Sequence, residues 1–254
     1  MPVGSNSHFF DSYGVRIHYH LYGQRPALIF VHGHPENEMI FSQQINEFAR
    51  DHTIVLPTLR GYPPSDAVFA ATDVGGILGQ KLAFLHPERL SGLVIFNTPI
   101  LGTIMHLIHH DKEQQALTAY SIKYIKHNPG DDYDLDHVVR TIPDPEYRAE
   151  IKVYLPQSLE RGIFYFFRRN FPGPPYGQDI DTSGMHYSMP CCIIWGCKSC
   201  NFSHTMLDGF YKWFDRSVRL VTLPDAGHWL WRDDPAKVKK ELRSWLTVLE
   251  GGHL

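Results

Sequence analysis

The sequence predicts an α/β fold in which helices cover a mostly parallel sheet. Short apolar runs alternate with amphipathic segments along much of its 254 residues, and this alternation is typical of buried parallel strands joined by helices. A second observation is that the middle of the chain lacks such runs and instead has an aromatic, helix-like pattern interrupted by Pro and Asp. We therefore expect one sheet-containing core with a helical insertion.

The expected elements follow this pattern in order. The chain opens with an antiparallel hairpin, residues 8–13 and 15–22, whose side chains alternate in character around Gly14. The expected buried strands are residues 27–31, 53–56, 67–71, 93–96, 191–195 and 218–223. The expected core helices are residues 41–49, 77–85 and 235–249. Residues 1–99 and 185–254 then form the core, and residues 100–184 form a helical cap.

Composition and charge narrow the class of protein. The chain has 24 Lys and Arg against 27 Asp and Glu, a formal net charge of −3, which disfavours nucleic acid as a partner because phosphate binding needs clustered cations. No apolar run approaches the roughly 20 residues that span a membrane, and residues 1–7 lack the features of a signal peptide. We expect a cytoplasmic protein with no membrane partner. A homodimer is compatible with the sequence.

Asp73 stands in a distinctive stretch, Ala71-Thr72-Asp73-Val74-Gly75-Gly76, between an apolar run and a helix-like segment. Small residues on both sides of one reactive residue are typical of a nucleophile elbow, a sharp strand-to-helix turn. Serine is the usual residue at the apex, whereas a carboxylate there forms an ester by displacement at carbon. The alternative is that Asp73 only caps the following helix.

Two clusters of metal-binding residue types occur elsewhere. Cys191, Cys192, Cys197 and Cys200 fall within ten residues, and the last two could form a redox pair or half of a zinc site. However, neighbouring residues of a strand point to opposite faces of the sheet, so a site using all four is geometrically awkward. A second cluster, His106, His109 and His110, lacks a nearby Cys or spaced acidic partner. We expect no metal and no organic cofactor.

Six short motifs in order carry a family resemblance. They are His32-Gly33-His34-Pro35, Leu59-Arg60-Gly61-Tyr62, Asp73-Val74-Gly75-Gly76, His86-Pro87-Glu88-Arg89, Trp195-Gly196 and Ala226-Gly227-His228-Trp229. The chain closely resembles the α/β-hydrolase fold, and within it the branch with an aspartate nucleophile, which contains epoxide hydrolases and haloalkane or haloacetate dehalogenases. Residues 164–176 are similar to a cap segment of epoxide-hydrolase-like members, which favours epoxides over halides.

This resemblance implies specific roles in the hydrolysis of a small apolar substrate. Asp73 would attack an electrophilic carbon and form an alkyl ester, and His228 would activate the water that hydrolyses this ester. Backbone N–H groups of Val74 and His34 would stabilise the oxyanion of the tetrahedral intermediate. The residues expected to contact the substrate are Pro35, Tyr165, Phe167 and Trp229.

The orienting acid of the family is missing from its expected positions. The family commonly has an acid after the strand that ends in Trp195-Gly196, and Ser199 occupies that place. The alternative position, after the preceding core strand, holds Asn97. Neither side chain balances an imidazolium charge as a carboxylate does, and Asp208 is a further candidate.

Three other positions depart from the family pattern. Epoxide hydrolases use cap tyrosines to protonate the epoxide oxygen, and Phe167 stands where one is expected, so the candidate donors are Tyr120, Tyr124 and Tyr154. Val74 stands where dehalogenases often have Trp. Only residues 59–66 separate two neighbouring expected strands, with no room for the usual crossover helix. The alternatives to an epoxide hydrolase are a haloacid or haloalkane dehalogenase, another α/β-hydrolase, and a catalytically silent α/β-hydrolase that binds a ligand or a partner.

Overall fold

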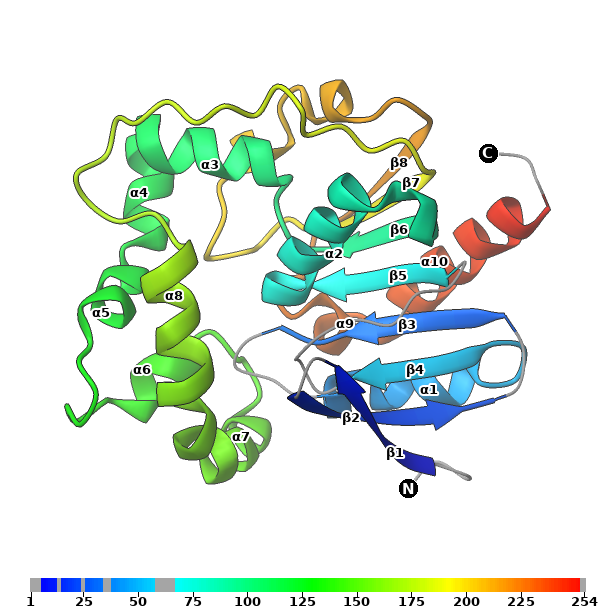
Figure 1. Cartoon of the computed structure of the whole chain (residues 1–254), viewed down its shortest axis with the longest axis horizontal. Helices are drawn as coiled ribbons and strands as arrows, with labels where there is room; N and C mark the ends of the chain where they lie inside the picture. Colours follow the sequence, from blue (N-terminus) through cyan, green and yellow to red (C-terminus); the bar gives the residue numbers. More distant parts are fainter. Residues whose placement is uncertain (1–5, 13–14, 24–25, 34–37, 58–66, 252–254) are drawn as a thin grey trace.

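The computed structural model describes residues 6–12, 15–23, 26–33, 38–57 and 67–251, and within these ranges the chain forms one eight-stranded sheet. The strands are β1 Asn6–Ser12, β2 Val15–Tyr22, β3 Ala27–Val31, β4 Thr53–Pro57, β5 Ala67–Thr72, β6 Leu90–Phe96, β7 Cys191–Gly196 and β8 Val218–Leu223. Their order in the sheet is β1-β2-β4-β3-β5-β6-β7-β8, with β1 and β2 antiparallel to their neighbours and the others parallel (Figure 1). The predicted mixed, mostly parallel sheet is confirmed.

The two faces of the sheet bury two separate hydrophobic clusters. On β3, Leu28 and Phe30 belong to one cluster and Ile29 and Val31 to the other, because successive strand residues point to opposite faces. Helices α1 Ser42–Phe48 and α10 Pro235–Glu250 contribute to the first cluster. Helices α2 Asp73–Leu85 and α3 Leu101–His110 contribute to the second. Both faces are therefore covered, as buried parallel strands require.

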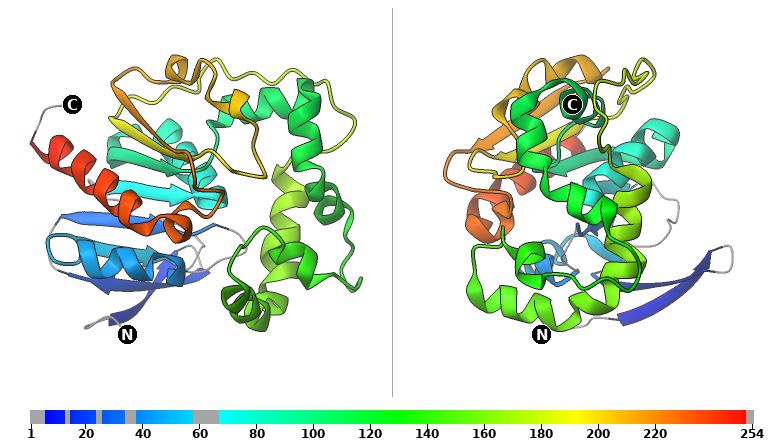
Figure 2. Two further views of the ribbon diagram at one scale, coloured as in Figure 1. Left: turned by 180° about the vertical axis from the view of Figure 1, so that it is seen from behind. Right: turned by 90° about the vertical axis from the view of Figure 1, so that its left-hand side faces the viewer.

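Further helices between β6 and β7 lie beyond the carboxyl ends of the strands, as Figures 1 and 2 show. They are α4 Lys112–Thr118, α5 Tyr120–Lys126, α6 Leu135–Val139, α7 Pro145–Ser158, the π-helical turn η3 Leu159–Phe164 and α8 Tyr165–Asn170. We call α4 to α8 the cap helices. Within the described part of the chain, no helix has both the length and the apolar character needed to cross a membrane.

Two boundaries differ from the sequence expectation. The helix after β5 begins at Asp73, four residues earlier than predicted, so Asp73 is its first residue. Residues 171–190, which the sequence pattern placed partly in the helical region, contain no helix. Pro172, Pro174 and Pro175 explain this, because proline has no N–H to donate and clashes with a preceding helical turn.

Glycines let the chain pass closely around Asp73. A Cβ at Gly75 would lie 2.6 Å from the carbonyl oxygen of His32 and 2.7 Å from that of Val31, and a Cβ at Gly33 would lie 2.4 Å from the Cβ of Asp73. Side chains larger than hydrogen do not fit at either position. The small residues that predicted an elbow are thus required by contact between β3 and the start of α2.

Replacing Gly75 by alanine is expected to destabilise the fold by about 1–3 kcal/mol, because the methyl group meets backbone atoms that cannot rotate away. Urea unfolding would measure this as a lower midpoint with an unchanged slope. Gly162→Ala is the matched control, because a Cβ at Gly162 meets no atom within 4 Å. Equal stability of the two variants would show that the elbow relaxes without cost.

Candidate active site

Asp73 occupies a strained backbone conformation at the junction of β5 and α2. Its φ of 48° lies in the left-handed region, which few residues other than glycine adopt and which persists where the surrounding structure enforces it. The close approach of Gly33 and Gly75 supplies that enforcement. Asp73 therefore stands at a sharp turn from strand to helix, the backbone geometry in which a nucleophile elbow presents its side chain.

The two oxygens of the Asp73 carboxylate face different partners. The backbone N–H of Val74 donates a hydrogen bond to Oδ1 at 2.7 Å, and the Nε2 atom of His228 lies 3.5 Å from Oδ2. The side chain of Asp73 retains 19% of its solvent exposure, whereas that of His228 retains 2%. The structure thus brings Asp73, Val74 and His228 together. The remaining predicted oxyanion residue, His34, and the predicted contact residue Pro35 lie outside the described residues.

His228 is buried in the loop between β8 and α9 Leu230–Asp233. The loop is held by a hydrogen bond from the Gly227 N–H to Asp233 Oδ2 at 2.7 Å and by one from the Lys198 N–H to the Ala226 carbonyl at 2.8 Å. Gly196 allows this approach, because a Cβ there would lie 2.1 Å from the Gly227 carbonyl oxygen. The Gly of the sequence motif Trp195-Gly196 is thus required by its contact with the loop of His228, a contact that the sequence alone does not show.

The second ring nitrogen of His228 contacts an amide. The Nδ2 group of Asn97 lies 3.0 Å from Nδ1 of His228, and the backbone N–H of Gly196 donates to the Oδ1 of Asn97 at 3.0 Å. Asn97 follows β6, has a φ of 40° and is completely buried. Among the candidates for the orienting position, the structure therefore places Asn97 beside His228.

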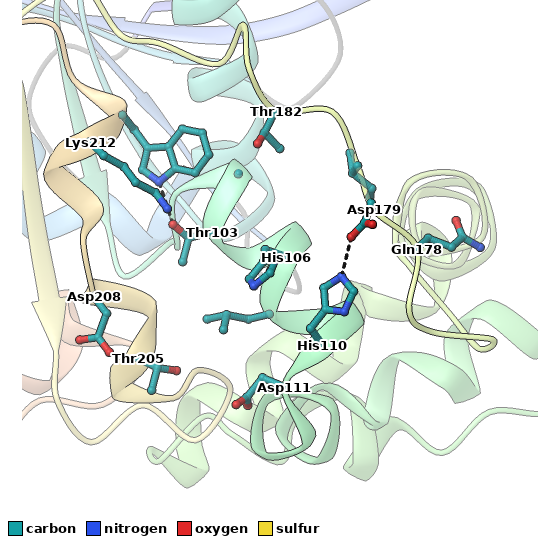
Figure 3. A pocket seen from close by; sticks show the side chains of 14 residues that line it. Thr103, His106, His110, Asp111, Gln178, Asp179, Thr182, Thr205, Asp208 and Lys212 are labelled. Atoms are coloured by element: carbon teal, nitrogen blue, oxygen red, sulfur yellow. Dashed lines mark hydrogen bonds and ion pairs between the residues drawn. The ribbon is translucent and has the colours of Figure 1, made fainter.

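The other two candidates for that position lie elsewhere. The Ser199 hydroxyl accepts a 3.4 Å hydrogen bond from the backbone N–H of Asn201 in the turn after β7. Asp208 lines a separate cleft of about 490 Å³ on the outer side of α3, together with His106, His110, Asp179 and Lys212 (Figure 3). In this cleft His110 Nε2 lies 3.1 Å from Asp179 Oδ1.

The cap helices contribute a cluster of aromatic side chains that includes Tyr120, Tyr124 and Phe167. The ring of Tyr120 packs edge to face with those of Tyr124 and Phe167, with centroids 5.7 Å and 6.2 Å away. Burial raises the pKa of the Tyr120 hydroxyl well above its ordinary value, and the charge of Asp73 raises it further. Burial also raises the pKa of Tyr124, where Arg140 opposes the shift and Asp73 contributes least. After burial, the Asp73 charge is thus the largest influence on the pKa of Tyr120, whereas it is the smallest of several influences on the pKa of Tyr124.

The remaining predicted contact residues have different surroundings. Phe167 is buried within the aromatic cluster, while Tyr165 on the same helix is 52% exposed and has the Arg169 guanidinium 5.7 Å from its ring centroid. Trp229 is buried, and its indole N–H donates to the Thr141 carbonyl at 2.8 Å, which ties the loop of His228 to the cap. The side chain of Tyr154 lies outside the described part of the structure.

Two of the four cysteines are buried in the core, whereas Cys197 is partly buried and Cys200 is exposed. Cys191 and Cys192 on β7 belong to the two opposite hydrophobic clusters, as the strand pattern predicted. Burial raises the pKa of both thiols, that of Cys192 to about 12, so they carry no reactive thiolate at neutral pH. Across the residues that the structure describes, no three His, Cys, Asp or Glu side chains come together as a group that could hold a metal ion.

Comparison with curated proteins finds distant relatives over nearly the whole chain, although no model of a protein family matches it. Epoxide hydrolase 3 of Xenopus tropicalis is 22% identical over 288 residues, covering 92% of this chain and 75% of that protein. Epoxide hydrolase 4 of Homo sapiens is 22% identical over 281 residues, covering 92% of this chain and 76% of that protein. Both alignments are longer than the 254 residues of this chain, so the relatives contain segments that it lacks.

Comparison with solved structures finds the same arrangement of sheet and helices. An epoxide hydrolase of Bacillus megaterium in complex with an inhibitor has a TM-score of 0.78 at 22% identity, covering 94% of this chain and all of that one. A mutant of an epoxide hydrolase from Bacillus megaterium, complexed with its product (R)-3-[1]naphthyloxy-propane-1,2-diol, has a TM-score of 0.79. An epoxide hydrolase from metagenomes of hot environments has a TM-score of 0.80 at 18% identity.

Proposed function

We propose that this chain, which has the α/β-hydrolase fold and is related to epoxide hydrolases, opens epoxides through a covalent ester on Asp73 that water then hydrolyses. One observation carries the proposal. The Asp73 carboxylate has one oxygen held by the Val74 N–H at 2.7 Å and the other facing His228 Nε2 at 3.5 Å. This division suits a covalent mechanism, in which one oxygen bonds to the substrate and the other carries the negative charge that develops during hydrolysis.

In the first step, Asp73 Oδ2 attacks a carbon of the epoxide ring. A bond forms between that oxygen and the ring carbon, while the bond from this carbon to the ring oxygen breaks and leaves its electron pair on oxygen. The Tyr120 hydroxyl donates a proton to this oxygen, and its raised pKa keeps that proton in place until the oxygen becomes basic. The product of this step is a hydroxyalkyl ester of Asp73.

In the second step, water adds to Cγ of the ester and passes a proton to His228 Nε2. Negative charge develops on Oδ1, where the Val74 N–H already donates a hydrogen bond. The bond between Cγ and the alkyl-bearing oxygen then breaks, this oxygen takes the proton, and a diol leaves. His228 acts as the base only when Nε2 has a free electron pair.

Several side chains favour an apolar epoxide over a halide. Phe167, Tyr120 and Tyr124 pack together as an aromatic cluster on the cap helices, and Trp229 is buried beside His228 in the same loop. Ring opening needs a proton on the leaving oxygen, whereas a departing halide does not, so a partly buried tyrosine whose pKa is influenced by the Asp73 charge favours the first reaction.

A single turnover in ¹⁸O-labelled water tests the mechanism, with enzyme in excess over phenyl glycidyl ether. We expect an unlabelled diol, because its new oxygen comes from Asp73, and one ¹⁸O atom in the peptide that contains Asp73. Mass spectrometry of the diol and of the digested protein measures both. Label in the diol of this first turnover would mean that water attacks the epoxide directly. Stabilisation of the protein by the ether without ester or diol would instead indicate a binding protein.

A further inference from the structure

The hydrogen bonds around Asn97 fix which end of its amide faces His228. The Gly196 backbone N–H can only donate, so the Asn97 atom 3.0 Å from it is the carbonyl oxygen. The amide NH₂ therefore faces Nδ1 of His228 at 3.0 Å. An amide NH₂ can only donate, so Nδ1 is the acceptor and has no proton.

This contact selects one form of the imidazole. A neutral histidine carries its single proton on one of its two ring nitrogens, and the amide of Asn97 occupies the electron pair of Nδ1. The proton is then on Nε2, the atom 3.5 Å from Asp73 Oδ2. Nε2 is also the nitrogen that has to accept a proton from water in the second step, and in this form its electron pair is not available.

Rotating the Asn97 amide by 180° would place its oxygen beside Nδ1 and allow the proton to sit there, but this orientation is unfavourable. The NH₂ would then meet the Gly196 N–H, leaving two donors without acceptors in a place where Asn97 is fully buried and His228 is 3% exposed. A buried donor without a partner costs about 1–3 kcal/mol. The observed orientation is therefore the stable one.

We propose that Asn97 is a positioning residue that holds His228 with its proton on Nε2, so that the chain captures an epoxide on Asp73 and releases the diol slowly. The inference rests on the proposed function and identifies hydrolysis of the Asp73 ester as the step that limits turnover. Ring opening needs only the Asp73 carboxylate and a proton donor, so it proceeds. Hydrolysis of the ester needs Nε2 as a base, and an amide in place of the orienting acid lowers turnover by about 10⁴ in serine proteases through the wrong tautomer.

Asn97→Asp is the direct test, because aspartate has nearly the same shape. One carboxylate oxygen would still accept from the Gly196 N–H, and the other would accept from Nδ1–H of His228, which frees Nε2. Asn46→Asp on the exposed side of α1 introduces the same charge away from the site and is the control. It is expected to behave as the unmodified protein.

The three proteins are mixed with excess phenyl glycidyl ether, and intact-protein mass spectrometry follows the ester while chromatography follows the diol. The unmodified protein and Asn46→Asp are expected to gain one equivalent of the ether rapidly and to form diol slowly. Asn97→Asp is expected to show little ester and at least tenfold faster steady-state diol formation. Diol formation without ester in the unmodified protein, at a rate that Asn97→Asp does not change, would overturn the inference while leaving the proposed function intact.

The tautomer is measured independently by long-range ¹H–¹⁵N NMR of the histidine rings, without any epoxide. We expect the proton of His228 on Nε2 in the unmodified protein and on Nδ1 in Asn97→Asp. A proton on Nδ1 in the unmodified protein would overturn the inference whatever the kinetics. If Nε2 carries the proton but neither protein forms ester or diol, the proposed function fails and the slow release inferred from it fails too.

Discussion

Replacing Asp73 by asparagine is expected to abolish both the ester and the diol, with a loss in turnover of about 10⁴-fold or more, as for the removal of other catalytic nucleophiles. An amide oxygen is a far weaker nucleophile than a carboxylate oxygen, so the first bond to the epoxide carbon should not form. Mass spectrometry after incubation with phenyl glycidyl ether measures the ester, and chromatography measures the diol.

The fold of this variant is expected to persist. Asparagine tolerates a positive φ about as well as aspartate, and its side-chain oxygen can still accept the hydrogen bond from Val74. Asp179→Asn is the matched control, because Asp179 is almost fully exposed at the separate cleft. Both variants are expected to unfold at similar temperatures, and only Asp73→Asn to lose activity. Undiminished diol formation by Asp73→Asn would assign the chemistry to another residue.

Much of the core could be predicted from the sequence because burial on both faces leaves a local signal. The run at β3 is continuously apolar since its alternate residues enter different hydrophobic clusters. The elbow was also predictable, because Gly75 has to be small for β3 to pass beside it. These signals lie within a few residues of one another along the chain. Reading them requires no knowledge of distant contacts.

The arrangement behind His228 could not be predicted in the same way. It joins three distant segments: Asn97 follows β6, Gly196 ends β7 and His228 lies in the loop after β8. Gly196 is 99 residues from Asn97 along the chain, and His228 is 131 residues from it. Sequence alone left Ser199, Asn97 and Asp208 as alternatives, and only their positions in space distinguish them. The orientation of the Asn97 amide depends on a backbone N–H, which no residue type reveals.

The cap shows a similar limit. Phe167 stands where a cap tyrosine is expected, but the sequence does not indicate which tyrosine lies nearest Asp73. The structure distinguishes Tyr120 from Tyr124 through the environment of each hydroxyl. Tyr124 is buried and its hydroxyl interacts with Arg140, whereas the Asp73 charge is the largest influence on the pKa of Tyr120 after burial. This difference leads to a prediction about ring opening.

Tyr120→Phe is expected to slow formation of the Asp73 ester by about 10²–10⁴-fold, the usual contribution of a general acid. Without the hydroxyl, the ring oxygen has to leave as an alkoxide in surroundings that disfavour new charge. Phenylalanine keeps the edge-to-face contacts with Tyr124 and Phe167, so packing and stability should change little. Rapid-mix mass spectrometry measures the rate of ester formation, which separates this effect from slow hydrolysis.

Two further substitutions identify the donor. Tyr124→Phe is expected to have a smaller effect on ester formation, because its hydroxyl interacts with Arg140 and weakly with Asp73. Tyr211→Phe is the control, because Tyr211 lies between β7 and β8 and is 69% exposed, and it should leave ester formation unchanged. A larger loss in Tyr124→Phe than in Tyr120→Phe would reassign the proton donor to α5's second tyrosine. Since that hydroxyl already contacts a guanidinium, the Arg140 charge would then assist proton transfer by lowering the pKa of Tyr124.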